Sequence, residues 1–337
     1  MTMHSRSRRR GMTLVEIMIS LVLLGIVSGV VMRVVTRQQR FYQGVNQIMT
    51  QRGQLRQATS VLPIDLRSLS SVGEDILAAS DSAIEFNVNI GTGVVCAVIA
   101  GGTQLVLPPL SLAISSTTGN TYTSFFEGVE PTDSMVARGV YVYVYNDSNV
   151  VGNADDTWKR FDLVAMHGSF SDCLTKFGAG VVDAGKRRPV LQVSDPAGFT
   201  DAVTLGPISR YINPGAPVRL ARRVRYKLYQ EADGKWYLGF SEWHKGNNAY
   251  LSLSPVSGPY DPYSSGSGSG VRFRYYDVDG TEISSGAGAV DRARIARIDL
   301  IARARTSSAV RAAGIQNGVS QQYKDSLAVT VMLRNRQ

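Results

Sequence analysis

Glu16 is the residue whose position most clearly demands chemistry, because it is the only charged side chain in the run MTLVEIMISLVLLGIVSGVVM at residues 12–32. A carboxylate in a membrane-spanning helix costs about 2.5–3.5 kcal/mol at the bilayer centre and less near an interface, so it usually has a partner in the membrane. The alternative is a glutamate that extends to the lipid headgroups without a specific partner. The pattern therefore predicts either a paired carboxylate inside the membrane or a solvated one at its surface.

The apolar run itself has the length of a transmembrane helix. Its 21 residues, at a rise of about 1.5 Å each, span about 30 Å, the thickness of a bilayer core. The run is too long for a typical signal peptide, and no A-x-A cleavage site follows it. The ten residues before Gly11 contain no acid and four arginines: Arg6, Arg8, Arg9 and Arg10. These charges favour a cytoplasmic N-terminus and an exported C-terminal body, and three later arginines (Arg33, Arg37 and Arg40) weaken this preference without reversing it.

The order of these features resembles the class III signal of type IV prepilins and pseudopilins: a basic leader, Gly11, then Met12-Thr13-Leu14-Val15-Glu16 and an unbroken apolar run. In that family a membrane aspartyl peptidase cuts after the glycine and methylates the new N-terminus. The resemblance implies cleavage between Gly11 and Met12, N-methylation of Met12, and Glu16 as the fifth mature residue. The Glu16 carboxylate would then neutralise the α-amine of a neighbouring subunit and set the register of assembly. The family's first mature phenylalanine is replaced here by methionine.

The helical pattern continues beyond the membrane segment. Apolar residues recur at helical spacings between polar ones, at Phe41, Val45, Ile48, Leu55 and Leu62. Pro63 predicts a break, so one helix of about 75 Å is expected from Met12 to about Leu62. Gly25 and Gly29 permit either close helix approach or local unwinding, or are merely tolerated there.

Beyond residue 80 the apolar period changes to two, which is typical of strands. The pattern appears in 84–88, 141–145, 218–228, 271–275, 292–304 and 327–333. In 218–228 the alternation assigns four basic residues to the solvent face: Arg219, Arg223, Arg225 and Lys227. Asp233-Gly234 predicts a hairpin turn into the following KWYLGF. The expected fold is α+β, with a long N-terminal helix packed on an antiparallel, strand-rich head. Its segments are the leader 1–11, the transmembrane or filament-core helix 12–32, the amphipathic continuation 33–62 and the head 63–337.

The two cysteines, Cys96 and Cys173, have no metal-site spacing. An exported body favours a disulfide between them, which would close a loop of about 78 residues and contribute roughly 3–4 kcal/mol. The alternative is two unrelated buried thiols.

Two acidic loops contain enough oxygen ligands to consider calcium. The first contains Asp147, Asn153, Asp155 and Asp156, next to Asn146, and the second contains Asp277, Asp279 and Glu282. The second is also an ordinary hairpin turn, in which Asp and Gly serve the backbone. Neither has the order of an EF-hand loop, so no cofactor is expected.

Other functional classes find little support. The net charge is +9, but the head and helix carry only 32 basic against 27 acidic residues once the leader's four arginines are set aside. The group Arg222, Arg223, Arg225, Tyr226 and Lys227 is divided between two strand faces, so nucleic acid is not an expected partner. No nucleophile elbow, HExxH motif or P-loop is present, so no enzyme activity is expected.

The body supports a narrower resemblance. LPIDLRSL, RRVRYKLYQEADGKWYLG, VRFRYYDVDGTEI and the closing SLAVTVMLRNR are similar to segments of PilW-type minor pilins and of the J pseudopilins of type II secretion. The resemblance implies a minor pilin that helps to start or cap a type IV pilus, with a J-like pseudopilin, or a tip adhesin or DNA-binding subunit, as alternatives. Implied partners are prepilin peptidase, other minor and major pilins, the inner-membrane assembly platform and, before assembly, membrane lipid. The implied location is the bacterial inner membrane with a periplasmic head, and then a pilus or pseudopilus that can reach the cell surface.

Overall fold

The computed structural model describes most of the chain. The described residues are 13–70, 75–99, 103–108, 125–126, 136, 139–146, 157–169, 188–194, 212, 214–310 and 321–333. They divide into two compact units. The helical unit comprises Met1–Gly53 with Arg305–Asp325, and the head unit comprises Gln54–Ala304 with Ser326–Gln337.

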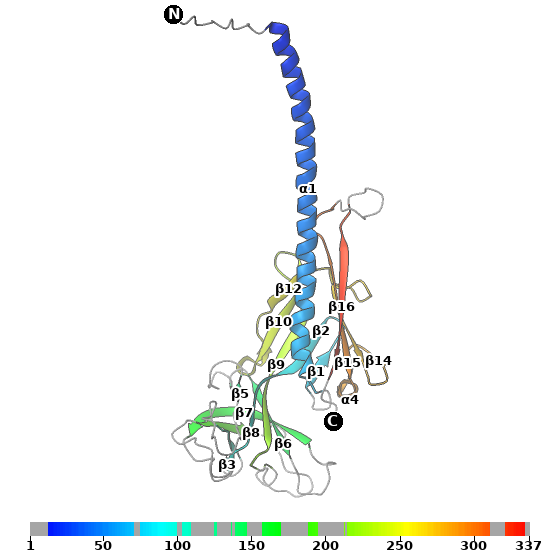
Figure 1. Cartoon of the computed structure of the whole chain (residues 1–337). Coiled ribbons are helices and arrows are strands. Elements are labelled where there is room, and N and C mark those ends of the chain that lie inside the picture. The colour runs from blue at the N-terminus through cyan, green and yellow to red at the C-terminus, as the bar shows by residue number, and fades with distance from the viewer. Residues whose placement is uncertain are drawn as a thin grey trace, which may run out of the picture. The chain divides into compact units, whose positions relative to one another are not determined.

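Helix α1 runs without interruption from Leu14 to Arg67 (Figure 1). The Thr13 hydroxyl accepts a hydrogen bond from the Glu16 backbone N–H at 3.3 Å, as an N-terminal cap does. This helix is the long N-terminal element expected from the apolar pattern.

The predicted break at Pro63 is wrong, because α1 continues beyond it to Arg67. An internal proline removes a backbone hydrogen bond and costs about 3 kcal/mol. Leu62 and Leu66, on either side of Pro63, are fully buried in the core of the head. Burying each leucine contributes roughly 1.5–3 kcal/mol, so packing of this last turn offsets the lost hydrogen bond.

One face of the C-terminal part of α1 is buried in the main hydrophobic core of the head, at Leu55, Ala58, Leu62 and Leu66. Phe41 does not continue this stripe, since its side chain is 50% exposed. Gly44 and Gln51 are also buried, within the helical unit. A Cβ at Gly44 would lie 3.5 Å from Cβ of Val310, so the missing side chain lets the segment 305–325 approach the helix.

The larger sheet contains twelve strands. They are β1 (Ile76–Ala79), β2 (Ala83–Val94), β3 (Ala97–Ile99), β4 (Gln104–Val106), β5 (Phe125–Phe126), β6 (Val140–Asn146), β7 (Thr157–Ser169), β8 (Arg188–Ser194), β9 (Pro217–Gln230), β10 (Trp236–His244), β11 (Ala249–Tyr250) and β12 (Ser254–Tyr260). The main order is β1-β2-β9-β6-β7-β8-β4-β3, and β10 joins β9, β11 and β12 beside this path. The described strand pairs of this sheet are all antiparallel, which agrees with the expected α+β head.

Strand β9 is a central strand of the larger sheet and pairs with three other strands. One edge pairs with β2 along most of its length, while the other pairs first with β6 and then with β10. Its predicted apolar face is buried, at Val218, Leu220, Val224, Tyr226 and Leu228. The predicted β9–β10 hairpin is confirmed, and Gly234 in its turn has φ +77°.

Arg219 departs from this alternation. The sequence pattern places it on the solvent face of β9, but it is buried. Its guanidinium forms an ion pair with the buried Asp75 at 2.9 Å, and that pairing is what permits a charge in the interior.

The smaller sheet has the order β14-β13-β15-β16. Its strands are β13 (Val271–Tyr276), β14 (Glu282–Ile283), β15 (Arg297–Arg305) and β16 (Lys324–Met332). The expected strand at 292–304 begins only at Arg297, because helix α4 (Ala289–Ala293) comes first. In β16, Val331 is buried as the alternation requires, whereas Leu327 is 36% exposed at the edge of the sheet.

Candidate functional site

The N-terminal part of α1 presents apolar side chains on all sides. Its most apolar 18-residue stretch has a mean hydropathy of 2.5 and contains no buried residue. In the part of the chain that the structure describes, α1 is the one helix long and apolar enough to cross a membrane. Exposed apolar surface of this extent requires lipid or other apolar helices to cover it.

Glu16 lies in the first turns of this apolar helix and is exposed. Its backbone carbonyl accepts a hydrogen bond from the Ser20 hydroxyl at 2.8 Å, and its N–H is capped by Thr13. Within residues 13–70 no cation pairs with its carboxylate, so the carboxylate is available to a group outside the described chain. The expected cleavage and methylation sites, Gly11 and Met12, lie outside the described residues.

Gly25 and Gly29 lie on the same apolar helix. A Cβ added at either position would meet no atom within 4 Å. Nothing within the single chain therefore requires glycine there, and both readings of the pair, close approach of another helix and simple tolerance, remain expectations.

The next part of α1 is fastened by the segment Arg305–Asp325 within the helical unit. Arg52 pairs with Asp325 at 3.1 Å and donates a hydrogen bond to the Tyr323 hydroxyl at 2.9 Å. Gln47 and Ser308 exchange hydrogen bonds at 2.9 and 3.0 Å. Together with the close approach at Gly44, these contacts hold successive turns of the helix. The sequence pattern gave no sign of them, since each joins residues about 260–270 positions apart.

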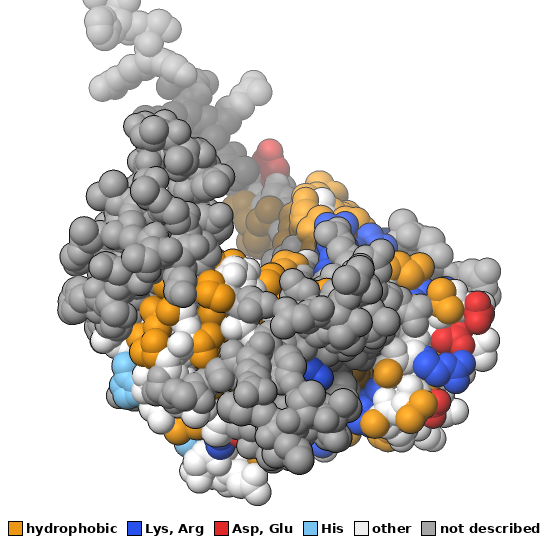
Figure 2. Space-filling model, turned by 90° about the horizontal axis from the view of Figure 1, so that it is seen from below, with side chains coloured by type: hydrophobic (Ala, Val, Ile, Leu, Met, Phe, Trp, Pro, Cys, Tyr) orange, Lys and Arg blue, Asp and Glu red, His pale blue; other side chains and the backbone are white. Residues whose placement is uncertain are grey.

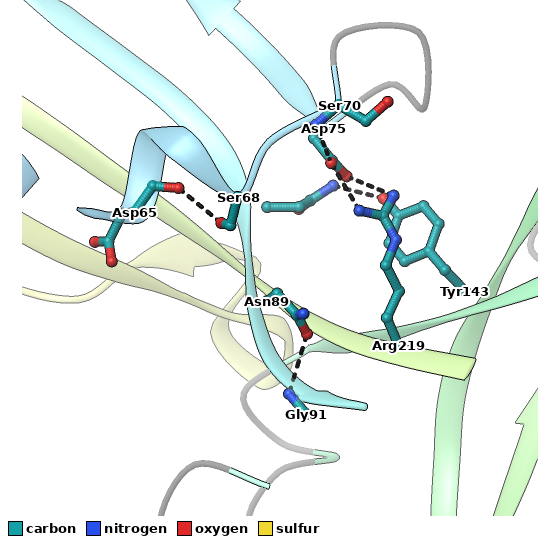
Figure 3. A network of polar contacts seen from close by, with 9 residues as sticks. Asp65, Ser68, Ser70, Asp75, Asn89, Gly91, Tyr143 and Arg219 are labelled. Atoms are coloured by element: carbon teal, nitrogen blue, oxygen red, sulfur yellow. Dashed lines mark hydrogen bonds and ion pairs between the residues drawn. The ribbon is translucent and has the colours of Figure 1, made fainter. Parts of the chain in front are cut away.

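A buried polar network fixes the inside of the head (Figure 3). The carboxylate of Asp75 accepts two hydrogen bonds from Arg219, at 2.9 and 3.1 Å, and one from the Ser70 backbone N–H at 2.8 Å. The guanidinium also lies 4.4 Å from the ring centroid of Tyr143, whose hydroxyl accepts a hydrogen bond from the Asn87 amide. Burial raises the pKa of Asp75, although Arg219 and the Ser70 N–H favour the ionised form. The network joins the segment after α1 to β2, β6 and β9, and its role is structural.

Four of the five basic residues of β9 have partners within the head, while the fifth, Lys227, is exposed. Arg222 pairs with Glu242 at 3.0 Å. Arg223 pairs with Glu85 at 2.9 Å. Arg225 lies 4.1 Å from the ring centroid of Tyr250. In Figure 2 the coloured Lys and Arg side chains form separate small groups on the face shown. The paired arginines of β9 therefore do not by themselves form the continuous basic surface that nucleic-acid binding uses, and the expectation about nucleic acid stays a prediction.

The acidic loop at 277–282 is a turn held by its own backbone. Asp277 accepts hydrogen bonds from the N–H groups of Asp279 and Thr281, at 3.0 and 2.9 Å, and pairs with Arg294. These hydrogen bonds lower the pKa of Asp277, and the one from the Thr281 N–H has the largest effect. Glu282 instead pairs with Arg274. Over the described residues no three His, Cys, Asp or Glu side chains gather as metal ligands, so the calcium reading of this loop is not supported.

Two further expectations fall partly or wholly on residues that are not described. The proposed calcium ligands Asp147, Asn153, Asp155 and Asp156 lie outside the described residues. Cys96 is disulfide-bonded, while Cys173, the other cysteine of the chain, lies outside them. Their pairing remains a prediction.

Comparison with known proteins gives one match, at the N-terminus. Residues 6–32 match the family model of the prokaryotic N-terminal methylation motif, which spans Gly11, Met12 and Glu16. A search of curated proteins and of solved structures finds no match to the chain. A prepilin-type motif implies processing by prepilin peptidase and assembly with other pilins, and it belongs to structural rather than enzymatic proteins. This motif and the apolar helix that carries it support a type IV prepilin-like protein.

Proposed function

We propose that this chain is a minor pilin of the PilW type, which helps to start or cap a type IV pilus. The observation that carries the proposal is the methylation motif at 6–32, continued by an exposed apolar helix and a large strand-rich head. The helix supplies a surface that other apolar helices can cover.

In this account the new chain first lies in the inner membrane, with its leader in the cytoplasm, its first helix in lipid and its head in the periplasm. Prepilin peptidase cuts between Gly11 and Met12 and methylates the new amine. The Glu16 carboxylate of one subunit then pairs with the amine of a neighbouring pilin, which fixes axial register as the subunit leaves the assembly platform. Apolar contacts between helices replace contacts with lipid, and such contacts do not favour one axial position of a helix over another. The pair of charges therefore determines the register.

The proposal makes the protein a substrate of an enzyme rather than an enzyme. Its buried charges are compatible with that view, because the carboxylate of Asp75 is paired with the guanidinium of Arg219 inside the head. No cofactor is required for assembly through helix packing.

The test compares Glu16→Ala with Ser20→Ala, a control on the same exposed helix whose hydroxyl bonds only to the Glu16 carbonyl among the described residues. A charge-assisted pair contributes about 1.5–3 kcal/mol, so Glu16→Ala should reduce surface filaments by about tenfold or more. Both variants should be cleaved normally, and Ser20→Ala should assemble normally. Normal filament numbers with Glu16→Ala would contradict the proposed register role.

A deletion strain and strains with an altered head surface distinguish the related alternatives. A J-like pseudopilin would leave surface pili intact when deleted and would instead abolish secretion of folded proteins into the medium. A tip adhesin or DNA-binding subunit would leave filament numbers intact and lose attachment or DNA uptake when the head surface is altered. Loss of pili on deletion, with secretion unchanged, is the result expected here.

A further inference from the structure

The edges of the two sheets differ in how they are protected. An open edge offers unpaired N–H and C=O groups to any other strand, and proteins block it with short strands, prolines, bulges or charges. Among the described strands, β1, β3, β5, β11 and β14 have between two and four residues each. The longer β12 contains Pro255 and Pro259, and its pairing with β10 shifts register twice.

Strand β16 has none of these devices along most of its length. It has nine residues and ends the smaller sheet, where β15 is its one neighbour among the described strands. Its segment Ser326–Met332 reads SLAVTVM and contains neither a charge nor a proline. The core-facing row is also incompletely covered, since Val331 is buried but Leu327 is exposed. An edge that is long, uncharged and partly apolar is suited to pairing with another strand.

We propose that the free edge of β16 binds an extended strand from a different pilin-like subunit of the same filament. The inference rests on the proposed function, because assembly is what brings such a subunit beside the head. The backbone groups of Leu327–Met332 would supply the hydrogen bonds. The partner strand would be uncharged over the paired length and would place an apolar side chain against Leu327.

The partner is a different subunit because the described part of the chain offers one long, uninterrupted open edge of this kind, that of β16. Two copies joined through β16 alone would form a closed, two-fold pair. Subunits stacked in one direction along a filament are not related by such an axis. A repeating array of copies would need a second long open edge. Among the described strands the longest other candidate is β7, where Leu163–Ser169 pairs with β8 alone, and a register shift between Leu163 and Ala165 interrupts that stretch.

The test is site-specific photocrosslinking in the full chain, in cells that assemble the filament. A benzophenone amino acid is placed in turn at Ala328, Thr330 and Met332, three exposed positions on one face of β16. Strand pairing predicts crosslinks to one subunit with its own N-terminal methylation motif. The crosslinked partner residue should move by two positions for each step of two along β16, because paired strands keep register. Crosslinks to scattered positions, to lipid, to nothing or to a second copy of this chain would overturn the proposal.

A variant pair gives an independent reading. Leu327→Lys places a charge at the open edge, and Val278→Lys places the same charge at an exposed site in the β13–β14 turn. The first should reduce the crosslink at Met332 by about tenfold, and the second should leave it unchanged. The register of the crosslinks needs neither variant, so misfolding of Leu327→Lys would not remove the test. Mature, methylated N-termini with no ordered crosslinks would refute the β16 inference alone, whereas uncut N-termini would refute the proposed function.

Discussion

Replacing Arg219 by methionine is expected to destabilise the head by about 4 kcal/mol. The side chain of Asp75 is 1% exposed and that of Arg219 is 11% exposed, so the pair is shielded from water. Without the guanidinium, the carboxylate keeps the Ser70 N–H as its one hydrogen-bond donor among the interactions described above. Removing one partner of a buried ion pair costs about 3–5 kcal/mol, and the lost stacking on Tyr143 acts in the same direction.

The assay is urea unfolding of the full chain in detergent, followed by tryptophan fluorescence. Trp158 is a suitable reporter because the Arg219 guanidinium lies 5.1 Å from its ring centroid. The matched control is Arg274→Met, which breaks the pair with Glu282, whose side chains are 38% and 44% exposed. Exposed pairs contribute about 0–1 kcal/mol, so the control should change the unfolding free energy little.

The Arg219→Met effect also has an expected pH dependence. Burial already raises the pKa of Asp75, and loss of Arg219 would raise it further. A carboxyl whose folded-state pKa is raised destabilises the fold once pH rises through the interval between the unfolded and folded pKa values. The deficit of Arg219→Met should therefore shrink as pH falls and the buried acid becomes protonated. A pH-independent deficit, or one no larger than that of Arg274→Met, would refute the reasoning.

Four other substitutions have expected outcomes. The lowered pKa of Asp277 contributes stability above its unfolded pKa that is lost as pH falls through the folded value, so Asp277→Asn should flatten acid unfolding monitored by circular dichroism. Gly44→Ala should be tolerated or stabilise by up to about 1 kcal/mol in thermal unfolding, since its Cβ would make ordinary contacts, whereas Gly239→Ala should destabilise because its Cβ would lie 2.5 Å from a tyrosine ring. Cys96→Ser should cost roughly 3–4 kcal/mol in urea unfolding, and peptide mapping of the oxidised wild type should recover Cys96 joined to Cys173; a linear, unpaired Cys173 peptide would contradict that pairing.

The alternating strands could be predicted from the sequence because successive side chains of a strand point to opposite faces. The alternation within one short segment therefore indicates which of its side chains are buried. Val218, Leu220 and Val224 in β9 are buried as their spacing requires. Arg219 could not be placed in the same way, since its partner Asp75 lies 144 positions away. A buried charge depends on a distant partner, and no local pattern contains that information.

The sequence predicts that a long N-terminal helix exists, but it does not predict where the helix ends or which of its side chains are buried. Pro63 has a strong local preference against helix interiors, and tertiary packing of the flanking leucines overrides it. The position of Phe41 and the role of Gly44 depend on where the segment 305–325 lies, which spacing along the helix does not determine. The open edge of β16 follows from strand order, which also requires the folded chain.

At the candidate site, the residues can be identified from the sequence, whereas their contacts can be read only from the folded structure. The prepilin-like motif is contiguous, so Gly11, Met12 and Glu16 could be recognised without any structure. The basic residues of β9 needed the structure, because their ion pairs and ring contacts come from other strands.

The central claim is tested most directly by the mass of the N-terminal peptide from cells with and without prepilin peptidase. The account predicts a mature chain that begins at N-methylated Met12 when the peptidase is present, and a chain that keeps residues 1–11 when it is absent. A chain that keeps residues 1–11 in both strains would contradict the account and leave α1 as an ordinary membrane anchor.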